Sequence, residues 1–153
     1  MMRIYKRFGF LLGIVLTGQI HAVTCFITMV KGHCWKAYDV SVDVLDANSG
    51  QKKISLVIPE NQMWVRQPFE CKPGDTLALT AKFSPAFWAG DEEKTFPGQR
   101  YWKLPTTVNA GETGWNVTVC FPKYFANVPT PPDAATNCDC DLSTIPKLAP
   151  PSA

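Results

Sequence analysis

Histidine is nearly absent from this chain: the 153 residues include two, and only His33 follows residue 22. A Ser-His-Asp or Cys-His catalytic site would therefore have to use His33, which lies in a predicted turn. The sequence also lacks a glycine-rich phosphate loop, an H-E-x-x-H motif and a nucleophile elbow. Residues 91–93 are carboxylates suited by type to glycoside hydrolysis, but adjacent acids on a loop are usually a solvated charge run. The sequence predicts that the protein is not an enzyme.

The sequence also lacks cysteines and histidines at the spacing typical of a metal site. His33 lies next to Cys34, and Cys138 and Cys140 are separated by one residue, but no second cysteine pair has the spacing of a zinc site. There is also no C-x-x-C motif within a thioredoxin-like pattern. We therefore expect no metal and no cofactor. The open alternative is that Cys138 and Cys140 form a redox dithiol or bind a soft metal.

Neither sign of charge dominates the chain. After residue 22, twelve basic and thirteen acidic residues remain, and they are scattered. A nucleic-acid-binding protein would normally carry a basic stripe, so we expect no nucleic-acid partner. No hydrophobic run after residue 22 is long enough to cross a membrane. We expect no transmembrane segment once the N-terminal segment is removed.

That N-terminal segment has the features of an export signal. Arg3, Lys6 and Arg7 precede an apolar run at 8–17, and Ala22 offers a small residue at a cleavage point. The run is too short for a membrane-spanning helix, so residues 1–22 are predicted to be a cleaved signal peptide. Its short basic start suits a bacterium and predicts a periplasmic or secreted protein. A lipoprotein acylated at Cys25 is a less favoured alternative, because acylation would leave five cysteines.

Helical periodicity is absent after the signal, whereas apolar and polar residues alternate repeatedly. The clearest case is a hairpin in which 38–44 pairs with 54–58 around the turn at 48–50, so that Val44 faces Ile54, Val42 faces Leu56 and Val40 faces Ile58. Further alternation predicts strands at 77–83 and 115–121, with shorter ones at 24–30, 63–66 and 100–103. About seven short strands predict an all-β protein built as a small antiparallel β-sandwich, with a small barrel as the alternative. The tyrosine corner is missing, so the sandwich is immunoglobulin-like in architecture only.

Six cysteines follow the signal, as expected for disulfides in an oxidising compartment. Six cysteines allow fifteen complete pairings, and excluding the small ring between Cys138 and Cys140 leaves twelve. Because those two must then bond elsewhere, the proline-rich C-terminal segment is predicted to be attached at two points. The division we predict is a sandwich domain at 23–121, a strap at 122–145 tied to it by disulfides, and a flexible tail at 146–153. The pairing itself stays open among Cys25, Cys34, Cys71, Cys120, Cys138 and Cys140.

Aromatic residues supply the candidate binding surface. The loop at 84–99 is long for a sandwich connection, and long loops that are not disordered tend to be functional. Planar aromatic rings with nearby acids can form protein-binding hot spots or stack on sugars. The sequence therefore predicts an exported binding or structural protein of the bacterial cell envelope that engages a protein partner, with carbohydrate or peptidoglycan binding as the alternative. A role in simply covering the ends of the sandwich is equally compatible with the pattern. The candidate residues are Phe87, Trp88, Phe96, Tyr101 and Trp102.

Overall fold

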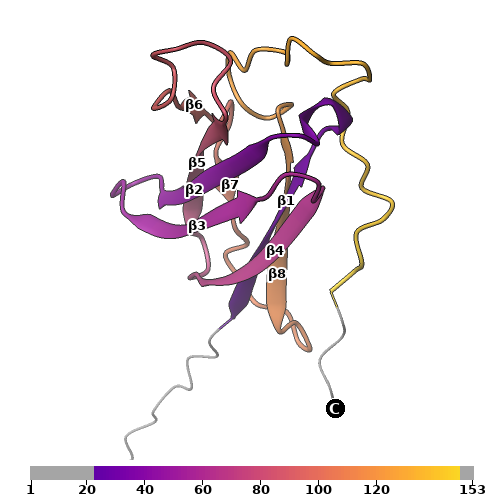
Figure 1. Ribbon diagram of the computed structural model, residues 1–153. Coiled ribbons are helices and arrows are strands. Elements are labelled where there is room, and N and C mark those ends of the chain that lie inside the picture. Colours follow the sequence, from indigo (N-terminus) through magenta and orange to yellow (C-terminus); the bar gives the residue numbers. More distant parts are fainter. Residues whose placement is uncertain (1–22, 149–153) are drawn as a thin grey trace, which may run out of the picture.

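The computed structural model describes residues 23–148 and contains two β-sheets that enclose one hydrophobic core (Figure 1). The smaller sheet has the strand order β4-β1-β8 and is formed by Trp64–Glu70, Thr24–Lys31 and Gly114–Phe121. The larger sheet has the order β3-β2-β5-β6, with β7 also paired to β5; its strands are Lys52–Ile58, Asp39–Asp46, Thr76–Ser84, Phe96–Pro97 and Trp102–Lys103. Within residues 23–148 the only helix is the 3₁₀ turn η1, His33–Trp35. The predicted disulfide-stapled all-β sandwich is confirmed. The predicted signal peptide and residues 149–153 of the predicted tail lie outside the described residues.

The predicted β2–β3 hairpin forms with the expected register. Val40 pairs with Ile58, Val42 with Leu56 and Val44 with Ile54. The three valines are buried in the core, as are Leu56 and Ile58. Gly50 has a φ of 72° in the connecting turn, which is a conformation that glycine adopts without a steric penalty. Side-chain alternation is therefore enough to determine the register of this hairpin, because a shift of one residue would turn its whole apolar face to solvent.

One strand pair differs from the antiparallel arrangement expected for the sandwich. β1 and β8 run parallel, with Val30 opposite Cys120 and Lys31 opposite Phe121. The segments that follow both strands therefore leave the sheet at the same end. Alternation reports which face a side chain takes and carries no information on strand direction, so the sequence pattern could not distinguish the two arrangements.

One strand is longer than predicted, and one strand was not predicted. β4 extends to Glu70, beyond the expected 63–66, and includes Pro68. Because β4 is an edge strand, a proline there removes no necessary ladder hydrogen bond. β6 lies within the segment expected to be a long loop, where Phe96 pairs with Ala81.

The strand registers define one end of the sandwich, which we call the aromatic end. β2 begins here, β3 and β5 end here, and β1 and β8 also end here. Its connecting segments are 32–38, 59–63, 85–95 and the strap up to Cys140. Beyond Cys140 the strap runs along the small sheet, where Leu142 and Ile145 lie beside Asn116. In Figure 1 the loop after β5 and the first part of the strap both lie at the top of the sandwich.

Three disulfides hold the strap and the small sheet, and the described residues contain no free cysteine. The bonds are Cys25–Cys71, Cys34–Cys138 and Cys120–Cys140. The predicted two-point attachment of the strap is therefore confirmed, and Cys138 and Cys140 do not bond to each other. Three disulfides are typical of proteins that fold in an oxidising compartment.

The strap passes very close to the segment that follows β1. The backbone N–H groups of His33 and Cys34 donate to the carbonyl oxygens of Asp139 and Asn137, both at 3.1 Å. A Cβ atom at residue 32 would overlap the carbonyl oxygen of Cys138, so this position requires glycine because of the close approach. The strap is thus hydrogen-bonded to the aromatic end as well as cross-linked to it.

Lys31 is fully buried at the end of β1, where it joins two turns of the aromatic end. Its ammonium group donates to the carbonyl oxygens of Tyr38 at 2.6 Å and Pro59 at 2.7 Å, with a longer contact to Lys36 at 3.4 Å. Three backbone acceptors match the three donors of an ammonium group. Burial lowers the pKa of Lys31 from 10.5 to about 8, and the charges of Asp39 and Glu60 oppose this shift.

This pKa shift predicts a pH-dependent stability. Between pH 8 and 10.5 the unfolded chain holds the Lys31 proton more tightly than the folded protein, so the stability contributed by this residue should rise with pH. We expect the free energy of unfolding of the wild type, relative to that of Lys31→Met, to increase by roughly 3 kcal/mol across this pH range. Urea unfolding of both proteins at several pH values measures the difference. A difference in unfolding free energy that stays constant or falls as the pH rises would contradict the lowered pKa of Lys31.

Candidate binding surface

An aromatic cluster fills the core beneath the aromatic end. Trp35 is fully buried in η1, and the centroids of four other aromatic rings lie 4.8–5.6 Å from its own. Aromatic pairs at such separations stabilise beyond the area they bury. The neighbouring rings come from β5, β8 and two loops, so this tryptophan connects both sheets to the loops above them: Tyr38, Phe83, Phe87 and Phe121.

The cluster continues outward to the surface through the loop after β5. Phe87 stacks on Trp35 with an interplanar angle of 21° and a centroid distance of 5.6 Å. Trp88 then packs edge-to-face against Phe87 at 5.6 Å. Trp88 is 58% exposed, which makes it the outermost ring of a continuous stack. A large aromatic side chain is thus presented to solvent on a support that is itself anchored in the core.

A shallow cavity of about 290 Å³ lies beside Trp88. Its lining comes from the end of β5 and the following loop: Phe83, Ser84, Pro85, Ala86, Phe87, Trp88, Ala89 and Glu92. Glu92 is exposed, and one of its carboxylate oxygens accepts a hydrogen bond from the backbone N–H of Gly90 at 2.8 Å. The cavity therefore combines an exposed aromatic ring with a carboxylate held by its own loop.

The neighbouring acids of this loop are engaged by lysines. Glu93 forms an ion pair with Lys82 at 2.7 Å, and Asp91 forms one with Lys94 at 3.7 Å. These exposed pairs add little stability, but they partly neutralise the two carboxylates that flank Glu92. Among the described residues, Glu92 is the acid of this run without a lysine or arginine partner.

The strap supports the same cluster from the other side. The hydroxyl of Tyr38 donates a hydrogen bond to Asp133 at 2.7 Å. Burial, together with this hydrogen bond and the charge of Asp133, raises the pKa of Tyr38 to about 12. Farther along the cluster, Phe125 of the strap is buried against Phe121 at 5.5 Å. Tyr38 and Asp133 were not among the residues predicted for the site, because the contact spans 95 positions of the sequence and no local pattern reports it.

Phe96 requires a correction to the predicted set. It is only 3% exposed, and its ring stacks on Phe83 at 5.4 Å. The short strand β6 turns this side chain into the core, so Phe96 cannot present its ring to a partner. The sequence of this segment does not show which of its aromatic side chains is exposed and which is buried.

Trp102 and Tyr101 lie apart from Trp88. Trp102 pairs with Leu77 near the start of β5, whereas Trp88 follows the end of that strand. Leu77 and Ser84 are seven positions apart in this extended strand, which corresponds to roughly 24 Å. Trp102 is partly buried and packs against the Arg100 guanidinium at 3.6 Å. Tyr101 is 70% exposed. The predicted aromatics therefore do not form one surface.

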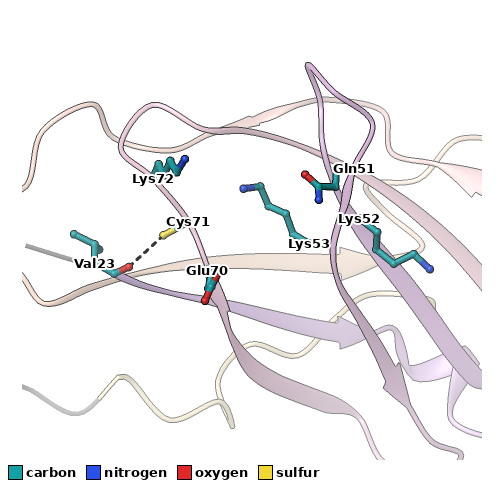
Figure 2. Close-up of a pocket in the computed structure, with 7 residues that line it drawn as sticks. All are labelled: Val23, Gln51, Lys52, Lys53, Glu70, Cys71 and Lys72. Carbon is teal, nitrogen blue, oxygen red and sulfur yellow. Dashed lines mark hydrogen bonds between the residues drawn. The ribbon is translucent and has the colours of Figure 1, made fainter. Parts of the chain in front are cut away.

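A second cavity, of about 490 Å³, lies at the opposite end of the sandwich, between the start of β3 and the end of β4. Figure 2 shows Lys53 and Lys72 extending toward one open space while Lys52 points away from it. The ammonium group of Lys53 is already paired with Asp75 at 2.8 Å, and Glu70 adds a further negative charge to the lining. No aromatic side chain lines this cavity. Its mixed charges favour no class of ligand.

Residues 23–148 contain no cluster of three or more potential metal ligands among histidine, cysteine, aspartate and glutamate. The same residues contain no helix with the length and hydropathy needed to span a bilayer. His33 is exposed at the start of η1, and Cys138 and Cys140 are each bonded to a cysteine of the sandwich. No protein-family model matches the chain, and comparisons with curated proteins and with solved structures found no match.

Proposed function

We propose that this chain is an exported, non-enzymatic binding protein of the bacterial cell envelope, and that it engages a protein partner through Trp88 and Phe87. The observation that supports this most is the 58% exposure of Trp88 on a stack of rings anchored in the core. Tryptophan is enriched among the residues that dominate binding energies. A ring whose support is fixed before binding loses little conformational entropy on association.

The strap is part of this proposal. Two disulfides bond it to Cys34 of η1 and Cys120 of β8, and Tyr38 donates a hydrogen bond to Asp133, so the strap is fixed to the elements that support the ring cluster beneath Trp88. In an envelope assembly, such cross-links would keep the binding surface in one arrangement without help from the partner. The cross-links also suit the extracytoplasmic destination predicted from the N-terminal signal.

The test is recovery of a partner from the native host with affinity-tagged protein. Trp88→Ala is expected to reduce partner recovery about tenfold or more, which corresponds to the loss of a hot-spot side chain. Tyr101→Ala is the matched control, because it also removes an exposed aromatic ring but from a different part of the surface. Both variants should retain the wild-type unfolding midpoint, since neither ring is buried. Equal recovery with all three proteins would overturn the proposal.

Carbohydrate binding through the same ring is the competing function, because an exposed indole beside a carboxylate also suits a sugar. Titration with soluble peptidoglycan fragments, followed by tryptophan fluorescence, distinguishes the two. A saturable fluorescence change in the wild type that is absent from Trp88→Ala would show that the ligand of this surface is a glycan and not a protein.

A further inference from the structure

The aromatic end carries an excess of negative charge. Its connecting segments, 32–38, 59–63, 85–95 and 122–140, contain three lysines and six carboxylates. The chain after residue 22 is close to balanced overall, so the excess is a property of this end. A surface of one sign attracts a partner of the opposite sign and increases the rate of encounter. The acids are Glu60, Asp91, Glu92, Glu93, Asp133 and Asp139.

Within this end, the exposed ring and an unpaired carboxylate line the same cavity. Trp88 and Glu92 both border the hollow of about 290 Å³ after β5. Glu92 is held by the Gly90 N–H through one oxygen, which leaves its other oxygen available. The indole face attracts a cation through its quadrupole, and the carboxylate can accept a charge-assisted hydrogen bond.

We propose that the cavity beside Trp88 accepts an arginine or lysine side chain from a basic segment of the protein partner. The cation lies over the indole while its N–H groups donate to Glu92, and its aliphatic stem covers the apolar lining formed by Ala86 and Phe87. This inference rests on the proposed function, since it names the chemistry of the partner at the same surface. A neutral or acidic segment would leave Glu92 desolvated without a partner.

A synthetic peptide pair tests the charge preference directly. The first peptide is a decapeptide of alternating arginine and glycine, and the second replaces each arginine with citrulline, which has nearly the same shape without the charge. With isotopically labelled protein, we expect the arginine peptide to shift the indole N–H resonance of Trp88 with a dissociation constant of about 1 mM. The citrulline peptide should produce no saturable shift. Absence of binding by the arginine peptide up to about 10 mM would overturn the inference.

Three variants locate the interaction. Glu92→Gln removes the charge and retains an oxygen for the Gly90 N–H, so the turn is preserved. It should weaken arginine-peptide binding about threefold to fivefold, as should Trp88→Phe, whose smaller ring attracts a cation less strongly. Because Trp88→Phe lacks the indole resonance, binding to the variants is followed through the backbone amide resonances of residues 85–95, measured in the wild type as well. Glu93→Gln is the matched control, because its carboxylate is already paired with Lys82, and it should have a smaller effect than Glu92→Gln. Equal effects of the two glutamate variants would show that the cavity itself does not bind the cation.

The two proposals fail in different ways. Loss of partner recovery with Trp88→Ala, combined with unchanged recovery in Glu92→Gln and equal binding of both peptides, would overturn the cation preference and leave the binding function intact. Unchanged recovery with Trp88→Ala would overturn the binding function, whatever the peptides show.

Discussion

Replacing Trp35 with alanine is expected to lower the free energy of unfolding by about 4 kcal/mol, because the change removes a fully buried side chain of large volume. The ring contacts aromatic residues from both sheets, so the surrounding structure has little freedom to collapse into the space. Urea unfolding monitored by far-UV circular dichroism measures the change. A domain of this size has a total stability of only about 5–15 kcal/mol, so the variant should be visibly less stable.

Trp88→Ala provides the control for this result. It removes the same side-chain type from the outer end of the same aromatic stack, where the ring is 58% exposed. We expect its unfolding free energy to lie within about 0.5 kcal/mol of the wild type. A large loss of stability in this variant would mean that the exposed ring serves the fold, and the case for a binding surface would weaken accordingly.

Removing one disulfide at a time is expected to lower the free energy of unfolding by an amount that increases with the length of chain that the bond closes. The sequence separations are 104 residues for Cys34–Cys138, 46 for Cys25–Cys71 and 20 for Cys120–Cys140. Restriction of the unfolded chain then corresponds to stabilisation of about 4.7, 4.0 and 3.3 kcal/mol. Replacing both cysteines of a bond with serine avoids leaving a reactive thiol.

The measurement is urea unfolding of the three double-serine variants under identical non-reducing conditions. The Cys34 and Cys138 variant should be the least stable, because that bond closes the longest loop of the unfolded chain. If the Cys120 and Cys140 variant were instead the least stable, local packing of the strap would outweigh chain entropy.

The parts of the fold that the sequence predicted are those governed by local alternation. The β2–β3 register followed from three apolar pairs and a turn, since both depend on residues within about twenty positions of each other. The two-point attachment of the strap followed from the one-residue spacing of Cys138 and Cys140, which disfavours a bond between them.

The remaining features depend on contacts between distant segments. The parallel pairing of β1 with β8 is what brings Cys34 and Cys120 to one end, beside the strap that bonds to both. Neither composition nor periodicity carries that information, so twelve pairings remained open. For the same reason, the sequence could not show which aromatic side chains form the binding surface. Phe96 and Trp88 lie on one loop, but only strand pairing decides that the first enters the core and the second faces solvent.

The central claim is that Trp88 is a point of contact with a protein partner, and site-specific crosslinking in intact cells of the native host tests it most directly. A photocrosslinking amino acid, p-benzoylphenylalanine, replaces Trp88 in one strain and Tyr101 in another. We expect illumination to join one defined protein to the chain from position 88, with little product from position 101. Crosslinks of equal yield and pattern from both positions, or none from position 88, would contradict the claim.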